Sequence, residues 1–379
     1  MRASAVLICL TVAATVGART ITVDDDAPAD FNNIQAAIDD ANDGDTIIVR
    51  PGLYEECINF LGKNIALTGS KPADWKTVEE TIINGMGHGP WPHDHAVIFR
   101  GTELDCMLSG FNIKGSVIGV DLLFEYEPEN RMHGTISYCL FQRNYVGGAI
   151  VIEHCDGLIS HCIITNTRCS TMTPISTVND CHGLIENCTF ADNPAYSMRD
   201  IDISDGGELT VRNCIARLFV AGSSTLNVEF CSVQGPVMSG AGDYTLNVGP
   251  GNIYKDPCFV KHGYLDYNET PLDANDDFWV EGDYRLKSQA GRWDPTSNSW
   301  VCDDVTSPCI DAGDPMAPIG QEPFPNAGCI NMGAYGGTAE AGKSYFNAPV
   351  CETITAGDIN GDCLVDFKDF RLLALHWLE

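Results

Sequence analysis

The stretch Cys155-Asp-Gly-Leu-Ile-Ser-His-Cys162 reappears one period later as a near copy, Cys181-His-Gly-Leu-Ile-Glu-Asn-Cys188. A partial third copy, Leu209-Thr-Val-Arg-Asn-Cys214, places its cysteine at the same spacing again. Short β-rich blocks that recur at a period in the mid-twenties are typical of solenoids, in which each turn buries its apolar face only against its neighbours. Because the repeat contains no helical pattern, the sequence predicts an all-β fold, a right-handed parallel β-helix.

The cysteines of the repeats share one strand context. A free cysteine behaves as a small apolar residue, so these side chains are predicted to stack as an interior ladder: Cys139, Cys162, Cys188, Cys214 and Cys231. Disulfides are the alternative, and a zinc site is a third option that the absence of any CxxC pair weakens. Better disulfide candidates lie in loop-rich sequence: Cys302, Cys309, Cys329, Cys351 and Cys363.

Residues 1–18 have the pattern of an export signal. Arg2 supplies a positive charge, Ala5 to Ala14 is a short apolar run, and Val16-Gly17-Ala18 has small residues at the cleavage positions. A buried N-terminal strand is the alternative. No other stretch is apolar enough to predict a transmembrane anchor. We therefore expect a protein that is secreted or held at the cell surface.

The segment 19–255 is predicted to form the β-helix. Its first strand, Thr20 to Val23, is followed by apolar residues at helical spacing from Phe31 to Ala41. Asn32 and Gln35 are placed as a capping box, and Gly44 ends the helix. Such a helix would serve as an N-terminal cap, since the first turn of a solenoid otherwise exposes its core.

The bends between strands also leave a signature. Asn187 and Asn213 fall one period apart, each directly before a ladder cysteine. Asn tolerates a left-handed backbone, so the two predict a structural stack at a sharp bend.

The segment 256–347 changes composition and is predicted to be the loop-rich end of the β-helix and its C-terminal cap. Its tryptophans have two interpretations, packing in the cap or stacking on sugars: Trp279, Trp293 and Trp300.

The formal charge is −30, from 52 acidic and 22 basic residues. Such a chain is unsuited to nucleic acid, because little in it could neutralise a row of phosphates. The excess of acidic residues is better suited to binding calcium ions. An anionic polysaccharide would require a local basic patch or bridging calcium.

Several motifs resemble those of a known group of proteins. The chain opens with Ile21-Thr-Val-Asp-Asp-Asp26 and Gly44-Asp-Thr-Ile-Ile-Val-Arg-Pro-Gly-Leu-Tyr54, and later contains Ser307-Pro-Cys-Ile-Asp-Ala-Gly313. These elements resemble exported right-handed β-helix proteins of the pectin-lyase-like superfamily, notably those of planctomycete-type bacteria. The resemblance implies the fold over residues 20–345. It leaves the chemistry open among polysaccharide lyases, glycoside hydrolases, esterases, epimerases and non-catalytic surface proteins.

The tail, residues 348–379, contains a twelve-residue loop with oxygen donors at the spacing by which such loops bind Ca²⁺. The predicted ligands are the side chains of five residues and one carbonyl: Asp358, Asn360, Asp362, Asp366 and Asp369, with the Leu364 carbonyl. An apolar helix is expected to follow. The module resembles a single dockerin type I repeat, which implies a cohesin-like or envelope partner. Cys363 stands where the loop usually has Gly.

Catalytic candidates come from aligning the repeats on their cysteines. The alignment stacks Glu153, Asn179 and Asp205 in one column and places Asp180 in the next. Asp180 and Asp205 would then lie ~5 Å apart, near the separation of a retaining carboxylate pair, and Glu153 and Asp205 ~10 Å apart.

A second set of candidates, Arg199, Asp200 and Asp202, is predicted to face outward and would suit a lyase. Solvated polar positions are the alternative interpretation for both sets. The sequence thus predicts an exported, calcium-binding β-helix protein that binds or degrades extracellular polysaccharide, as a hydrolase or a lyase, and is attached through its tail. The alternative is a non-catalytic surface or adhesion protein.

Overall fold

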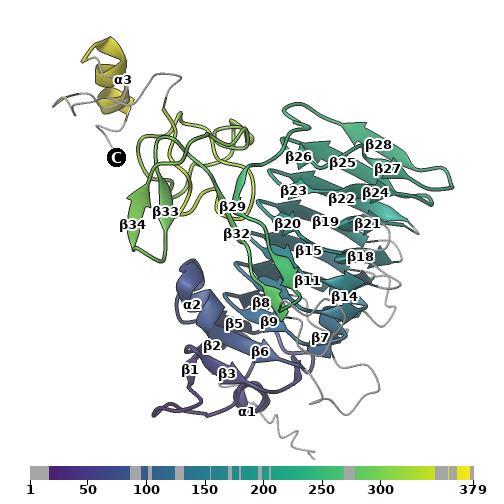
Figure 1. Cartoon of the computed structure of the whole chain (residues 1–379). Helices are drawn as coiled ribbons and strands as arrows, with labels where there is room; N and C mark the ends of the chain where they lie inside the picture. Colours follow the sequence, from purple (N-terminus) through teal and green to yellow (C-terminus); the bar gives the residue numbers. More distant parts are fainter. Residues whose placement is uncertain are drawn as a thin grey trace, which may run out of the picture.

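A computed structural model describes most of the chain. The described residues are 17–85, 95–100, 105–123, 132–153, 155–169, 173–178, 181–194, 199–204, 206–268, 278–345, 357 and 365–375. Three long parallel sheets form a rod that rises from the N-terminal strands to β28 (Thr245–Val248) (Figure 1).

The three sheets are named I, II and III. Sheet I contains β1 (Thr20–Val23), β2 (Thr46–Val49), β5 (Ala66–Gly69), β8 (Cys106–Ser109), β11 (Met132–Ser137), β15 (Cys155–Ser160), β19 (Cys181–Glu186), β22 (Gly207–Arg212), β25 (Thr225–Glu229) and β28. Sheet II contains β4 (Ile58–Asn59), β7 (His95–Arg100), β10 (Ile118–Leu123), β14 (Gly148–Glu153), β18 (Ile175–Val178), β21 (Ile201–Ile203), β24 (Leu218–Val220) and β27 (Met238–Ser239). Sheet III contains β3 (Gly52–Tyr54), β6 (Thr81–Asn84), β9 (Asn112–Lys114), β12 (Leu140–Gln142), β16 (Ile163–Thr165), β20 (Thr189–Ala191), β23 (Ile215–Ala216) and β26 (Ser232–Val233).

The pairing register confirms a coiled chain that adds one strand to each sheet per turn. Asp156 pairs with His182 and His182 with Glu208, two equal steps that match the period of the sequence repeat. The next step, from Glu208 to Thr225, is much shorter. The period therefore holds in the central turns only, because the loops between strands differ in length while the strands stay in register.

The predicted cysteine ladder is confirmed. Its five cysteines are at most 1% exposed and carry free thiols. The backbone N–H of Cys162 donates to Sγ of Cys188 at 3.5 Å, and that of Cys188 to Sγ of Cys214 at 3.4 Å. Burial raises the pKa of the Cys139, Cys188 and Cys231 thiols. These residues therefore act as small apolar groups along the core.

The bend before each ladder cysteine is left-handed, as the Asn pair predicts. Asn187 and Asn213 have φ of 49° and 53°, and the Asn213 side chain donates to Oδ1 of Asn187 at 3.3 Å. Tyr138 and His161 occupy the same bend in earlier turns and stack with ring centroids 4.6 Å apart. Hydrogen bonding and ring stacking between successive turns stabilise this strained column.

Helix α1 (Ile34–Asp40) lies at the N-terminal end of the rod, where Ile34, Ala37 and Ile38 are fully buried against the first strands (Figure 1). Its N-cap is Asn33, whose side chain accepts from the N–H of Ala36 at 2.8 Å. The prediction of Asn32 as the cap is therefore wrong by one residue. The remaining first-turn N–H groups are satisfied by Glu56, a residue from the next coil, in place of Gln35.

Replacing Asn33 by Ala is expected to destabilise α1 by about 1 kcal/mol, because the N–H of Ala36 loses its acceptor. Hydrogen exchange of the α1 amides measures the effect locally. The matched control is Asn32→Ala, which should leave exchange nearly unchanged. Equal acceleration in both variants would contradict the assignment of the cap.

The segment 256–345, named the closing segment, lies along the outer face of sheet III and does not close the last turn (Figure 1). Tyr335 packs on Trp75 of α2 (Trp75–Glu80), near the start of the rod, with ring centroids 5.2 Å apart. The prediction that this segment caps the C-terminal end of the β-helix is therefore wrong, because the segment packs against the side of the rod. The segment covers the outer face of sheet III, so that in β16 all three residues are buried.

Four short two-stranded sheets complete the β structure of the described chain. They are β13 (Tyr145–Val146) with β17 (Arg168–Cys169), β29 (Phe259–Lys261) with β32 (Asp283–Leu286), β30 (Tyr264–Asp266) with β31 (Phe278–Val280), and β33 (Arg292–Asp294) with β34 (Ser299–Val301). The last three pairs are antiparallel and belong to the closing segment.

The disulfides expected in the closing segment are not formed. Cys302, Cys309 and Cys329 carry free thiols. Cys309 is fully buried among apolar residues, whereas Cys302 is exposed. A disulfide needs Cβ atoms about 4 Å apart, and side chains in such different surroundings do not provide that approach. Cys351 and Cys363 lie outside the described residues.

The helix expected near the end of the predicted calcium loop is present as α3 (Phe367–Leu375), which begins before the last predicted ligand, Asp369. The described part of the chain contains no helix that is long and apolar enough to cross a membrane.

Candidate functional site

Alternation along sheet III sends every second side chain outward. In β9, β12 and β16 the inward residues are Ile113, Phe141 and Ile164, all fully buried in the core. The residues that follow them, Lys114, Gln142 and Thr165, stand in register on the outer face. This outward column is one wall of a groove.

The groove, named the flank groove, has a volume of about 440 Å³ and lies between sheet III, α2 and β32. Tyr284 of β32 joins the two walls, since its hydroxyl lies 2.6 Å from Oγ1 of Thr165. The ionisable side chains on its walls come from four separate parts of the chain: Glu79, Lys114, Arg143, Glu281, Asp283 and Arg285.

Three of these groups, Glu79, Lys114 and Glu281, have pKa values that are shifted toward neutrality. Desolvation in the groove raises the pKa of the Glu79 and Glu281 carboxyls, against the opposing effect of Arg285 and Arg143 respectively, although both side chains remain exposed at the surface. Burial and the nearby Arg143 guanidinium lower the pKa of the Lys114 ammonium. These shifts move the two carboxyls and the lysine toward the protonation states that acid–base chemistry uses.

Arg143 is held at the groove by Glu281. A guanidinium nitrogen of Arg143 lies 3.2 Å from Oε1 of Glu281, and the indole N–H of Trp279 donates to Oε2 of the same carboxylate at 2.9 Å. Arg143 has a left-handed backbone, with φ of 55°. A guanidinium has five N–H donors, so this ion pair leaves donors for an anionic ligand.

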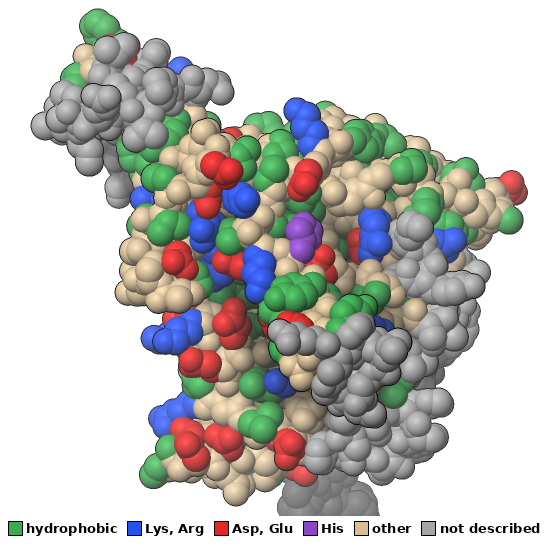
Figure 2. Space-filling view, viewed as in Figure 1, with side chains coloured by type: hydrophobic (Ala, Val, Ile, Leu, Met, Phe, Trp, Pro, Cys, Tyr) green, Lys and Arg blue, Asp and Glu red, His purple; other side chains and the backbone are tan. Residues whose placement is uncertain are grey.

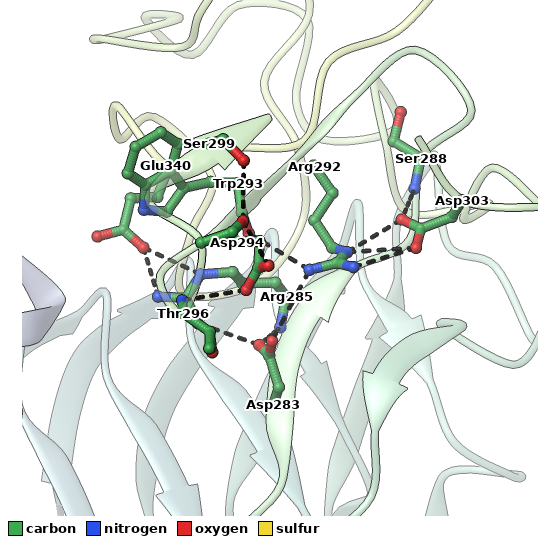
Figure 3. A network of polar contacts seen from close by, with 11 residues as sticks. Asp283, Arg285, Ser288, Arg292, Trp293, Asp294, Thr296, Ser299, Asp303 and Glu340 are labelled. Atoms are coloured by element: carbon green, nitrogen blue, oxygen red, sulfur yellow. Dashed lines mark hydrogen bonds and ion pairs between the residues drawn. The ribbon is translucent and has the colours of Figure 1, made fainter. Parts of the chain in front are cut away.

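Behind the groove a charge network fixes β32 and the hairpin β33–β34 (Figure 3). Arg285 is buried between Asp283, at 3.1 Å, and Glu340, whose Oε2 accepts from Nε at 3.0 Å. Arg292 pairs with Asp303 at 3.0 Å. Buried ion pairs of this kind restrict geometry more than they add stability, so the network acts as a rigid support for the groove wall.

Figure 2 shows Lys and Arg side chains interspersed with Asp and Glu over the face where the closing segment meets the rod. The local mixture contrasts with the formal charge of −30 for the whole chain.

The structure brings two of the predicted lyase residues together. Nη1 of Arg199 lies 3.1 Å from Oδ2 of Asp202, and the guanidinium stacks 3.3 Å over the ring of Phe219. These two residues lie on the outside of sheet II, away from the flank groove.

The prediction that Asp200 faces outward is wrong. It is 1% exposed and receives hydrogen bonds from Nε of Arg217 at 3.0 Å and from the Arg217 backbone N–H at 2.8 Å. The residue lies in a bend rather than in the strand, so the alternation of β21 does not apply to it. Asp200 and Arg217 border a second groove of about 530 Å³, which is also lined by Asp192 and His262, whose Oδ1 and Nδ1 atoms lie 2.8 Å apart.

The predicted carboxylate column is wrong where the structure tests it. Glu153 ends β14 and pairs with Val178, not with Asn179. The step between β14 and β18 is one residue shorter than the step between β15 and β19 in sheet I, because the connections differ in length. Asp180 and Asp205 lie outside the described residues.

Of the predicted calcium ligands, only Asp366 and Asp369 lie in the described chain. Asp369 is 2% exposed, and its carboxylate accepts from the N–H of Asp366 at 2.7 Å. Asp358, Asn360, Asp362 and Leu364 lie outside the described residues.

A further acidic group, Asp24, Asp25 and Asp26, brings carboxylate oxygens within 4.8 Å of one another. Arg50 pairs with Asp24 at 3.0 Å, and Asp25 accepts from the N–H of Leu53 at 2.9 Å. The group is therefore explained as a hydrogen-bonded turn.

Sequence reasoning missed every ionisable residue of the flank groove. Lys114 and Arg143 do carry a signal, since Lys114 ends a sheet III strand before the left-handed Gly115, and Arg143 is the left-handed residue that directly follows another. Nothing in the sequence pairs them with Glu281, which belongs to the closing segment, far along the chain from Arg143.

Comparisons with known proteins identify two families whose models match parts of the chain. The family described as "Right handed beta helix region" matches residues 127–234, and the family described as "Disaggregatase related" matches residues 234–313. A search of curated proteins finds no match.

Three solved structures are similar at 12% identity. Pectin methylesterase from carrot covers 64% of this chain and 90% of its own, with a TM-score of 0.37. Pectin methylesterase from Aspergillus niger covers 62% and 86%, with a TM-score of 0.30. Pectate lyase Pel9A covers 83% and 96%, with a TM-score of 0.33. The family match thus supports a right-handed β-helix in the centre of the chain.

Proposed function

We propose that this protein binds and cleaves an acidic polysaccharide in the flank groove by a lyase-type reaction. The observation that carries the proposal is the convergence of Lys114, Arg143 and Glu281 in one groove, with the pKa values of the lysine and the carboxyl shifted toward neutrality. The β-helix fold supplies a long straight flank, which suits an extended polymer.

In this mechanism Arg143 binds the carboxylate of a uronate unit and thereby acidifies the proton on the adjacent carbon. The neutral amine of Lys114 removes that proton, and the electron pair of the broken C–H bond forms a C=C bond as the glycosidic C–O bond at the next carbon breaks. A protonated carboxyl, that of Glu79, donates its proton to the leaving oxygen, while Glu281 remains the ion-pair partner of Arg143. Desolvation lowers the pKa of Lys114 and raises the pKa of the carboxyl of Glu79, so each group is shifted toward the protonation state that its role requires.

The test is a screen of the chain on polygalacturonate and alginate, with a neutral glucan as the control. Absorbance of unsaturated uronates reports elimination, and reducing ends report any cleavage. Unsaturated product from the acidic polymers alone supports the proposal. Reducing ends without unsaturation would indicate a hydrolase, and binding without cleavage would favour the adhesion function; both results contradict the lyase mechanism.

We also propose that residues 1–18 direct export, and that the tail binds Ca²⁺ and attaches the protein to a cohesin-like or envelope partner. The spacing of the ligands supports the calcium proposal, as does α3, which begins at Phe367 within the end of the loop and contains the last proposed ligand, Asp369. A buried carboxylate at the start of α3, Asp369, supplies charge that a cation would neutralise.

Replacing both Asp358 and Asp362 by Ala is expected to remove one equivalent of calcium binding, since two of the loop's charged ligands are lost. Titration calorimetry of the full chain measures the stoichiometry. The matched control is Asp25→Ala, in the acidic turn, which should not change it. An unaltered stoichiometry in the double variant would refute the calcium loop.

A further inference from the structure

A third groove lies on the other side of α2, against the hairpin β33–β34. It has a volume of about 670 Å³ and is named the tryptophan groove after Trp293 and Trp300. The two tryptophans are directly opposite each other in the hairpin, and their rings meet edge to face with centroids 5.6 Å apart. Both rings are only partly buried, so they present apolar surface to the groove.

The hairpin is a rigid support for these rings. Its turn is closed by Asp294, which accepts from the N–H of Thr296 at 3.1 Å and from the hydroxyl of Ser297 at 2.7 Å. Arg292 fastens its base to Asp303, and the ammonium of Lys343 lies 4.1 Å from the ring centroid of Trp300 (Figure 3 shows the arginine network). Rings held in this way lose little conformational entropy when they bind a ligand.

The opposite wall carries positive charge. Lys71 and Lys76 line it together with Asp74, and Glu340 lines the groove beside the hairpin. Asp74 is the N-cap of α2 and accepts from the N–H of Thr77, while Glu340 pairs with Arg285. Both carboxylates are therefore engaged, whereas neither lysine forms an ion pair with another described residue.

Apolar aromatic surface facing ammonium groups matches an acidic pyranose, whose ring carbons stack on an indole while its carboxylate meets a cation. Helix α2 separates this groove from the flank groove and contributes residues to both. Lys76 and Asp74 stand at one end of α2, and Trp75 and Glu79 of the same helix line the flank groove. Glu340, which lines the tryptophan groove, accepts a hydrogen bond from Arg285, which lines the flank groove.

We infer that the tryptophan groove is a second subsite, which binds an acidic sugar unit of the same polysaccharide at a distance from the cleavage site. The inference rests on the proposed function for the identity of the polymer. It predicts that long chains, which span both grooves across α2, bind more tightly than short ones.

Binding of polygalacturonate and of its tri- and octasaccharides to the full chain is the test, by titration calorimetry. Trp293→Ala and Trp300→Ala are each expected to weaken binding of the long ligands about tenfold, a typical loss for a buried aromatic anchor. Lys71→Gln with Lys76→Gln should weaken it several-fold and flatten its salt dependence. Trp293→Phe, which retains a ring, should recover most of the affinity.

The matched control is Tyr264→Ala. Tyr264 is an exposed aromatic residue of another hairpin and lines none of the three grooves. Thermal unfolding verifies that each variant is folded. Unchanged affinity in both the tryptophan and the lysine variants would overturn the inference. If these variants bind normally while Lys114→Met abolishes cleavage, only the inference of a second subsite is refuted. If none of the variants, Lys114→Met included, has an effect, the proposed function is refuted as well.

Discussion

Replacing Lys114 by Met is expected to lower kcat/KM on an acidic polysaccharide by about 10²- to 10⁴-fold, the usual contribution of a positioned general base. Methionine keeps much of the length of the side chain and removes the amine. Lys114 lies in the outward column of sheet III, at the end of β9, so the substitution leaves the buried core untouched. Initial rates of unsaturated product formation measure the effect.

Two controls separate the base from a simple positive charge. Lys114→Arg keeps the charge but cannot be deprotonated near neutral pH, so it should bind polymer normally and still lose activity. In the native protein activity should fall as the pH drops below the lowered pKa of Lys114, because the ammonium form cannot accept a proton. Retention of native kcat/KM by Lys114→Met would rule out its role as the base.

The second large effect concerns Glu322, a buried carboxyl of the closing segment. It is 8% exposed, and its Oε1 accepts from the N–H groups of Asn331, at 2.7 Å, and Gly337, at 2.9 Å. Its Oε2 is buried without a hydrogen-bond partner in the described chain. Burial raises the pKa of this carboxyl from 4.5 to about 7.

A raised carboxyl pKa means that the folded state binds the proton more tightly than the unfolded state does. The stability that Glu322 contributes is therefore fully present below about pH 4.5 and is lost as the pH rises to about 7. The shift corresponds to about 3 kcal/mol in the free energy of unfolding. Glu322→Gln, which stays neutral, is expected to be more stable than the native protein at pH 8 by about 1–3 kcal/mol and to differ little at pH 4.5.

Urea unfolding at the two pH values measures this difference. Glu322→Ala is the matched control, because it removes the acceptor of two backbone N–H groups and should destabilise the protein at both pH values. A Gln variant that gains no stability at pH 8 relative to pH 4.5 would contradict the burial of a charged carboxylate at this position.

Much of the fold could be predicted from the sequence because it is local or repeats between neighbouring turns. The cysteine ladder and the Asn bends follow from residues one period apart, and the structure has both. The helix at the start of the rod was also predictable, but its cap was displaced by one residue. A residue from the next coil, Glu56, supplies acceptors that a sequence motif cannot foresee.

The candidate site was not predictable in the same way. Glu153 was assigned to the wrong column because one connection is a residue shorter than the repeat, and a shift of one residue changes every later partner in that sheet. Asp200 was expected in solvent, but Arg217 of the following turn buries and neutralises it. Asp180, Asp205 and most of the calcium loop remain predictions.

The sequence by itself determined the coiled β architecture, since alternation, bends and stacking are decided by neighbours along the chain or one turn away. Only the tertiary structure decided where the closing segment lies. Its contact between Thr165 and Tyr284 joins residues 119 positions apart, and the Asn213 side chain accepts from the N–H of Asp314, 101 positions away. Such contacts depend on the shape and apolar surface of the finished rod, which exist only after the coils have stacked. The flank groove and the tryptophan groove are products of that docking.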